Sequence, residues 1–196
     1  MDKSQKRFSN RTGFTFGEDA LEYTIKDGTG RRTFSVDYAG ISTDTGEIEE
    51  RNDWYRNVGF FWVLVGVFLS YSRFSETGEM RASIWLTLGV ICLALYGFLK
   101  TTYTTLESEK GRIFIIQDSQ HDEIKDEIDS RRKNQWFRWY GTVDYDNDPQ
   151  SEIGKFQWLL DRDVITEDQF VEFRSLILDQ HGSLQEEDPS EKRTLN

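Results

Sequence analysis

Several residue types are scarce in this chain of 196 residues, and each scarcity excludes a class of protein. One cysteine, Cys92, excludes an intramolecular disulfide and every metal motif built from several cysteines. Two histidines leave little for a histidine-based metal or acid–base site. With 35 acidic and 24 basic residues the net charge is -11, which excludes sequence-independent nucleic-acid binding as the main activity, because neutralising phosphates requires a basic surface.

The common catalytic motifs are also missing. The sequence has no G-x-S-x-G, no phosphate-binding P-loop, no H-E-x-x-H and no G-x-G-x-x-G. Cys92 lies inside an apolar run, where its thiol is expected to stay protonated and inert. His121 is expected to be a solvated surface residue. The sequence therefore predicts no enzyme, no cofactor, no metal and no small-molecule substrate.

The apolar residues that are present concentrate in two runs. Residues 57–72 and 82–99 contain no charged side chain and are apolar on all helix faces, which suits lipid better than a two-layer core. They predict transmembrane helices over 54–74 and 82–100, with Trp54 and Tyr55 at the membrane interface. The alternative is a pair of buried core helices in a soluble protein. Four glycines in the runs allow close helix packing: Gly59, Gly66, Gly89 and Gly97.

The predicted spans form a hairpin through the polar turn 73–81. Basic residues near the span ends favour both termini in the cytoplasm, because five lie on the shared side of the termini and two lie in the turn. No apolar stretch resembling a signal peptide occurs in the first fifty residues, so the first span is expected to direct insertion.

Alternating apolar residues on both sides of this hairpin predict β-strands. Residues 14–50 contain a strand hairpin around the D-G-T-G turn at 27–30, and residues 101–117 contain another. The two halves, 14–50 and 101–140, are expected to form one β-rich cytoplasmic domain interrupted by the membrane hairpin. Residues 1–13 are expected to be disordered, and the acidic residues 44–53 to form a connector.

A helix is predicted to follow, capped by Ser119. Its first half is expected to close the sheet. Its second half mixes basic and aromatic residues, which gives two interpretations. Either the segment lies at the membrane interface, or its tryptophans pack on the sheet while the charges are solvated. The interfacial candidates are Arg131, Arg132, Lys133, Trp136, Arg138 and Trp139.

The C-terminal third begins with an acidic linker, 141–150, whose D-Y-D-N-D run lacks the glycine and terminal glutamate of a calcium-binding loop. Residues 151–179 predict a helical hairpin, with a capping box formed by Thr166 and Gln169. Because this segment is too short to bury much of a core, it is expected to dock on a partner. Residues 180–196 are expected to be a disordered tail. The interaction candidates are Ile153, Phe156, Leu160, Ile165, Phe170, Phe173 and Ile177.

Two resemblances accompany these patterns. Residues 152–178 resemble the SHOCT module, a short C-terminal helical hairpin of bacterial proteins with a G-V-I-T-x-x-E-F turn. Val164, Ile165, Thr166 and Phe170 match that pattern, whereas Asp163 stands in place of its glycine and Gln169 in place of its glutamate. The order of strands, membrane hairpin, strands and helix resembles bacterial membrane proteins with a pleckstrin-homology-like (YcxB-like) domain, although about five strands are recognisable here against seven in that fold.

Together these observations predict an α+β protein of the bacterial inner membrane. A transmembrane hairpin is inserted into a small β-rich domain, and a helical hairpin follows. The resemblance to SHOCT implies oligomerisation or protein binding, so the expected partners are membrane lipid and another copy or another membrane protein. The alternative function is an accessory subunit of a larger membrane enzyme or transporter, in which Gly66 and Gly89 would contact the larger protein.

Overall fold

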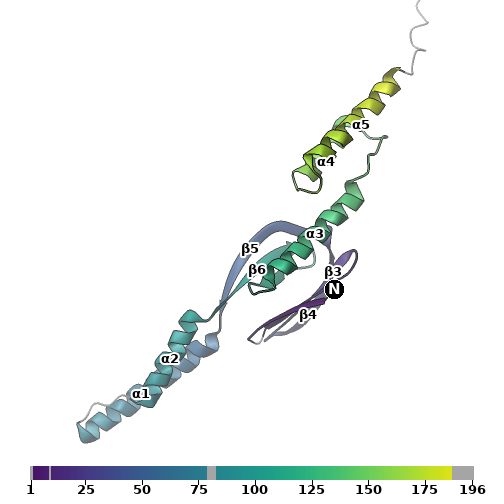
Figure 1. The fold of residues 1–196 in the computed structure, drawn as a ribbon. Helices are drawn as coiled ribbons and strands as arrows, with labels where there is room; N and C mark the ends of the chain where they lie inside the picture. Colours follow the sequence, from purple (N-terminus) through teal and green to yellow (C-terminus); the bar gives the residue numbers. More distant parts are fainter. Residues whose placement is uncertain (1, 9, 79–82, 187–196) are drawn as a thin grey trace, which may run out of the picture.

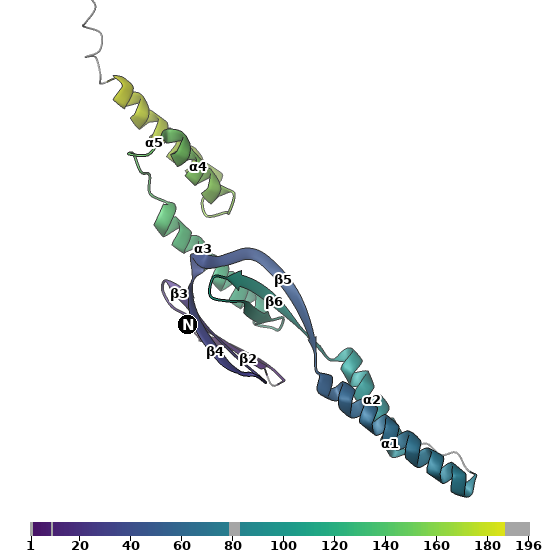
Figure 2. The ribbon, with the colours of Figure 1, turned by 180° about the vertical axis from the view of Figure 1, so that it is seen from behind.

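The computed structural model describes residues 2–8, 10–78 and 83–186, which form an elongated mixed α+β structure (Figures 1 and 2). The first sheet, sheet A, has the strand order β1-β2-β3-β4, and the second, sheet B, has the order β5-β6-β7. The strands are β1 (Asp2–Arg7), β2 (Asn10–Phe16), β3 (Ala20–Asp27), β4 (Gly30–Asp37), β5 (Ile41–Arg51), β6 (Lys100–Ser108) and β7 (Ile113–Ile116). The helices are α1 (Asp53–Thr77), α2 (Ile84–Phe98), α3 (His121–Tyr140), α4 (Pro149–Leu160) and α5 (Glu167–Glu186), with a 3-10 turn at Tyr38–Gly40.

Two strands lie where the sequence predicted none. Asp2–Arg7, inside the segment expected to be disordered, is β1, and the acidic connector is the second part of β5. Neither segment carries an apolar alternation that would mark it as a strand. Each is held by its neighbour instead, β1 by antiparallel pairing with β2 and β5 by antiparallel pairing with β6. Seven strands among the described residues therefore replace the five or so that were recognisable.

The two sheets share one core, which α3 covers. Phe14, Leu21 and Tyr23 of sheet A pack in one buried cluster with Ile113 of sheet B and Ile124 of α3. The first half of α3 therefore closes the sheets, as the sequence predicted. The predicted cap is wrong, because Gln120 occupies the N-cap position of α3 rather than Ser119.

Side chains also join the sheets at their edges. The amide of Gln5, which is buried, donates to the Ile116 carbonyl at 2.8 Å and accepts from the Ile116 N–H at 2.9 Å. It thereby replaces a strand partner for β7. The Tyr23 hydroxyl makes the equivalent pair of contacts with the backbone of Phe114. Burial raises the pKa of Tyr23 strongly, so its hydroxyl stays protonated.

Helices α1 and α2 form a hairpin between the adjacent strands β5 and β6 and lie at one end of the molecule (Figures 1 and 2). Glycines set their close approach, as predicted, at three of the four positions. A Cβ on Gly89 would lie 2.6 Å from the Val63 nitrogen, and one on Gly59 would lie 2.8 Å from the Leu93 side chain. Gly66 is equally crowded against Leu86, whereas Gly97 faces open space.

The bounds of this hairpin differ from the predicted ones. Helix α1 continues to Thr77, so the first part of the predicted turn 73–81 is helical, while residues 79–82 lie outside the described residues. Helix α2 has 15 residues and ends at Phe98. Among the described helices, α1 alone is long and apolar enough to cross a membrane by itself.

The last two helices lie at the opposite end (Figure 1). Helix α4 begins at Pro149, inside the predicted linker, with Asp148 as its N-cap. Helix α5 continues to Glu186, so residues 180–186 are helical rather than the start of a disordered tail. Residues 187–196 of that predicted tail lie outside the described residues.

Candidate functional site

The hairpin α1–α2 exposes large apolar side chains over most of its length. Leu64 and Ile84 are each 70% exposed, and Phe98 is 85% exposed. In water such a surface is unfavourable, because burial of apolar area is the main stabilising term in folding. The two helices are thus not core helices of the described structure, which was the alternative drawn from the sequence.

The predicted interface aromatics lie at the start of α1. Trp54 is 59% exposed and Tyr55 half-buried, with ring centroids 5.2 Å apart in an edge-to-face arrangement. Asn52 caps the helix by accepting the Trp54 N–H at 3.0 Å. The two rings therefore sit where the apolar hairpin joins the β-domain, which consists of sheets A and B with α3.

The second half of α3 does not have the form of an interfacial segment. Arg132 is buried and donates to the Ser42 carbonyl at 2.9 Å and to Asp129 at 2.5 Å. Burial lowers the pKa of the Arg132 guanidinium, and the neighbouring Asp129 carboxylate partly offsets this effect. Trp136 is buried as well. Arg132 and Trp136 are therefore not exposed as the interfacial interpretation expects, because both are buried against other parts of the chain.

The other interfacial candidates of this segment lie at the end of the domain opposite to α1–α2. Arg131 donates to the Gly17 carbonyl at 2.6 Å, and Arg138 pairs with Asp19 at 2.6 Å. Gly17 and Asp19 belong to the β2–β3 turn, which faces away from α1–α2 (Figures 1 and 2). Lys133 and Trp139 lie on the same half of α3, so this segment points away from the hairpin.

Helices α4 and α5 fold on each other and on the end of α3. Phe156 is fully buried and stacks on Phe173 at a centroid distance of 4.3 Å. Leu159, Ile165, Ile177 and Trp136 complete the buried cluster, with Ile153, Leu160 and Phe170 packed around it. The seven interaction candidates thus form or flank the internal core of the pair, and Phe156, Ile165 and Ile177 cannot contact an outside partner. In the described structure the helix pair packs on the end of α3 of the same chain, and its binding to another chain stays a prediction.

The helix pair, defined as α4 and α5 with their turn 161–166, carries the predicted capping box. Gln169 accepts the Thr166 N–H at 2.9 Å, and Thr166 accepts the Gln169 N–H at 3.3 Å. Asp163 has a φ of 53°, in the left-handed region that favours glycine. These contacts set the sharp reversal between the helices.

An aromatic clamp, which the sequence analysis missed, joins the helix pair to α3. Trp158 lies edge-on to Trp136 at 5.2 Å and to Tyr140 at 5.7 Å. The Arg162 guanidinium lies 4.4 Å from the centre of the Trp158 ring, within cation–π range. Their sequence spacing gave no signal, since α3 and α4 are separated by the linker.

Contacts with the first turns of α4 hold the linker in place. Glu152 is buried, pairs with Lys155 at 2.6 Å and accepts from the amide of Asn147 at 2.9 Å. Burial by itself would raise the pKa of Glu152, but these two contacts and the Asp144 N–H outweigh burial and lower it. Over the described part of the chain, no cluster of three or more histidine, cysteine or acidic side chains could hold a metal ion.

A wide groove of about 1110 Å³ separates the helix pair from the β-domain. Its helical wall includes Trp139, Trp158 and Arg162, and its other wall is formed by the ends of β4 and β5 and by the β6–β7 turn. The helix pair therefore contacts the rest of the chain chiefly through the end of α3.

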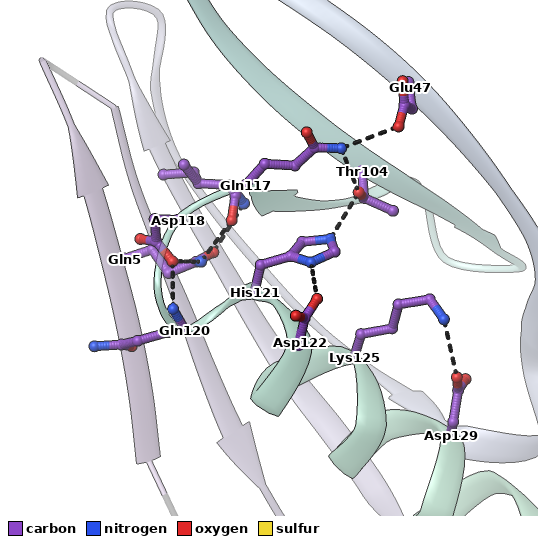
Figure 3. A network of polar contacts seen from close by, with 11 residues as sticks. Gln5, Glu47, Thr104, Gln117, Asp118, Gln120, His121, Asp122, Lys125 and Asp129 are labelled. Carbon is purple, nitrogen blue, oxygen red and sulfur yellow. Dashed lines mark hydrogen bonds and ion pairs between the residues drawn. The ribbon is translucent and has the colours of Figure 1, made fainter.

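His121 is not the solvated residue that the sequence predicted. Its Nε2 lies 2.8 Å from the Thr104 hydroxyl and its Nδ1 lies 2.7 Å from Asp122, and Gln117 continues the chain of contacts to Glu47 (Figure 3). Thr104 is itself buried in β6. Neither Thr104 nor His121 lines the groove between the helix pair and the β-domain. The network fixes the start of α3 on sheet B.

No family model, curated protein or solved structure matches the chain.

Proposed function

We propose that this chain is a membrane-anchored interaction protein without catalytic activity. Helices α1 and α2 span the bilayer, the β-domain stands at its cytoplasmic surface, and the helix pair is held at the far end, away from the lipid. Binding to another copy or to another membrane protein is the function of this arrangement.

The exposed apolar surface of α1–α2 carries the proposal. Helix α1 has 25 residues, which at 1.5 Å per residue gives about 37 Å, more than the roughly 30 Å of a hydrocarbon core. Helix α2 with 15 residues gives about 22 Å, which requires local thinning of the bilayer or help from flanking residues. In this proposal the β-domain ends of both helices lie on the same side of the membrane, because the helices connect to the paired strands β5 and β6.

The two resemblances support the same proposal. Seven strands in two sheets, closed by α3, equal the strand number of a pleckstrin-homology-like domain. The left-handed Asp163 stands where the SHOCT turn has glycine, and the Thr166–Gln169 capping box follows it. Fold likeness does not define a ligand, so the proposal concerns anchoring and interaction only.

If the chain is an accessory subunit, it must contact the larger protein through a surface other than Gly66 and Gly89, which the sequence suggested. Gly66 and Gly89 are occupied by the packing of α1 against α2. A larger membrane protein would have to contact the outer face of the hairpin, which includes Phe60, Leu64 and Phe68.

Cysteine labelling tests the anchor. In a Cys92→Ala background, single cysteines replace Ser75, near the end of α1, or Ser119, before α3; both positions are exposed. In intact bacterial cells a membrane-impermeant maleimide should label the Ser75→Cys protein, and should label the Ser119→Cys protein only after the membrane is opened. Equal labelling of both variants, or recovery of the protein in the soluble fraction, contradicts the proposal.

Crosslinking of full-length protein in membranes separates the two functions. A ladder of its own multiples indicates self-association, whereas one constant adduct with a larger membrane protein indicates an accessory subunit.

A further inference from the structure

Four basic residues lie directly opposite one another across sheet A. Lys6 pairs with Arg11, Arg11 with Lys26 and Lys26 with Arg31. Residues opposite each other in antiparallel strands project from the same face of a sheet. The core residues Phe14 and Tyr23 occupy alternate positions and therefore the other face. These four residues, the basic row, are all exposed on the outer face of sheet A.

The basic row is unfavourable in isolation. Like charges directly opposite each other destabilise a sheet. In the described part of the chain none of the four forms an ion pair with an acidic side chain. Asp27 follows Lys26, but its carboxylate accepts the N–H groups of Thr29 and Gly30 in the β3–β4 turn. The positive charge of the row is therefore available to bind an anion from outside the chain.

The basic row lies at the end of sheet A nearest the hairpin. The neighbouring Asn10 donates to Glu50 of β5 at 2.9 Å and to the Tyr103 hydroxyl at 3.1 Å. Glu50 precedes α1 by three residues, since α1 begins at Asp53. Figures 1 and 2 show this end of the sheet directed toward α1 and α2. The row and the predicted membrane boundary are therefore on the same side of the domain.

The spacing agrees with contact to a bilayer surface. Residues 50–53 and the first turn of α1 place the row about 15 Å from the uncharged segment of the hairpin, at 3.3 Å per strand residue and 1.5 Å per helix residue. The headgroup layer fills roughly 5–7 Å of this distance. Extended lysine and arginine side chains and a screening length of about 8 Å cover the rest. Four strands at about 4.8 Å give a row about 14 Å long.

We propose that the basic row contacts the headgroups of anionic phospholipids and holds the β-domain upright on the membrane. The inference rests on the proposed function, because it requires α1 and α2 to cross the bilayer. The exposed Phe8, at the tip of the β1–β2 turn with Arg7 over its ring, adds an apolar contact at the same edge. Residues 144–196 carry 14 acidic and 5 basic residues. The anionic headgroups therefore repel this segment.

Full-length protein in nanodiscs tests the contact. In a Cys92→Ala background, Ser4→Cys on the outer face of sheet A carries a fluorophore, and the discs contain a headgroup-linked nitroxide quencher. In discs of phosphatidylcholine with 30% phosphatidylglycerol, quenching should be at least twofold stronger than in pure phosphatidylcholine. Salt at 0.5 M should abolish the difference, because it shortens the electrostatic screening length to about 4–5 Å.

Charge-matched double variants provide the control. Arg11→Gln with Lys26→Gln should reduce quenching in anionic discs to the neutral-disc level. Lys110→Gln with Arg174→Gln removes the same charge from exposed positions on the β6–β7 turn and α5, and should leave quenching unchanged. Equal quenching in both disc types, or equal loss in both double variants, overturns the inference. Failure of the protein to enter discs at all refutes the membrane anchor instead.

Discussion

Replacing Phe156 with alanine tests whether α4 and α5 fold as one unit on the end of α3. The ring is fully buried, is stacked on Phe173 and lies in the cluster that contains Trp136. Removing a buried phenylalanine costs about 3–5 kcal/mol, from lost burial and from the cavity that remains. A core of this size supplies no more than about 3–5 kcal/mol. The substitution should therefore unfold the helix pair without affecting the sheets.

Hydrogen exchange measured by mass spectrometry reads this out segment by segment. A loss of 3 kcal/mol corresponds to exchange about 150-fold faster, so peptides from α4 and α5 should lose their protection while peptides from β3 and β6 keep theirs. Val171→Ala removes a side chain that is 64% exposed on α5 and is the matched control. Unchanged protection in α5, or simultaneous loss of protection in β3, would refute a separate helix-pair unit.

Two further predictions concern the other contacts. Gly89→Leu should lower the melting temperature of the helical signal in detergent, because its Cβ would overlap the Val63 backbone at a cost of about 1–3 kcal/mol, whereas Gly97→Leu should not. The pKa of Glu152 is lowered in the folded protein. The ionised Glu152 therefore stabilises the fold fully at pH values above its ordinary pKa of about 4.3, and this stabilisation is lost as the pH falls through the lower pKa of the folded state. Tryptophan fluorescence should show this loss, and Glu152→Gln should remove the step.

The sequence predicted the elements whose apolar residues follow a regular period. The strand hairpin around residues 27–30, the first half of α3 and the two C-terminal helices all have one apolar face, and each buries that face in the structure. The capping box at Thr166 and Gln169 is a local signal and was therefore readable. Interaction between lipid and the hairpin stays a prediction.

The features that were missed depend on distant residues. The segment Asp2–Arg7 has no apolar alternation and is a strand because β2 pairs with it and Gln5 binds β7. Arg132 and Trp136 were indistinguishable from their solvated neighbours in sequence, since the carbonyl of Ser42 and the ring of Trp158 come from other parts of the chain. The basic row is equally invisible, because four strands contribute one residue each.

The insertion of α1–α2 between β5 and β6 has a consequence for biosynthesis. A ribosome completes β1–β4 early, but the residues that cover their apolar face, Leu106, Ile113, Ile124 and Ile128, follow the whole hairpin. At about 5–20 residues per second, this delay lasts several seconds. During that time Phe14 and Tyr23 lack their final partners. Closure of the domain therefore waits until the whole hairpin has been synthesised, and until then sheet A is open to proteolysis.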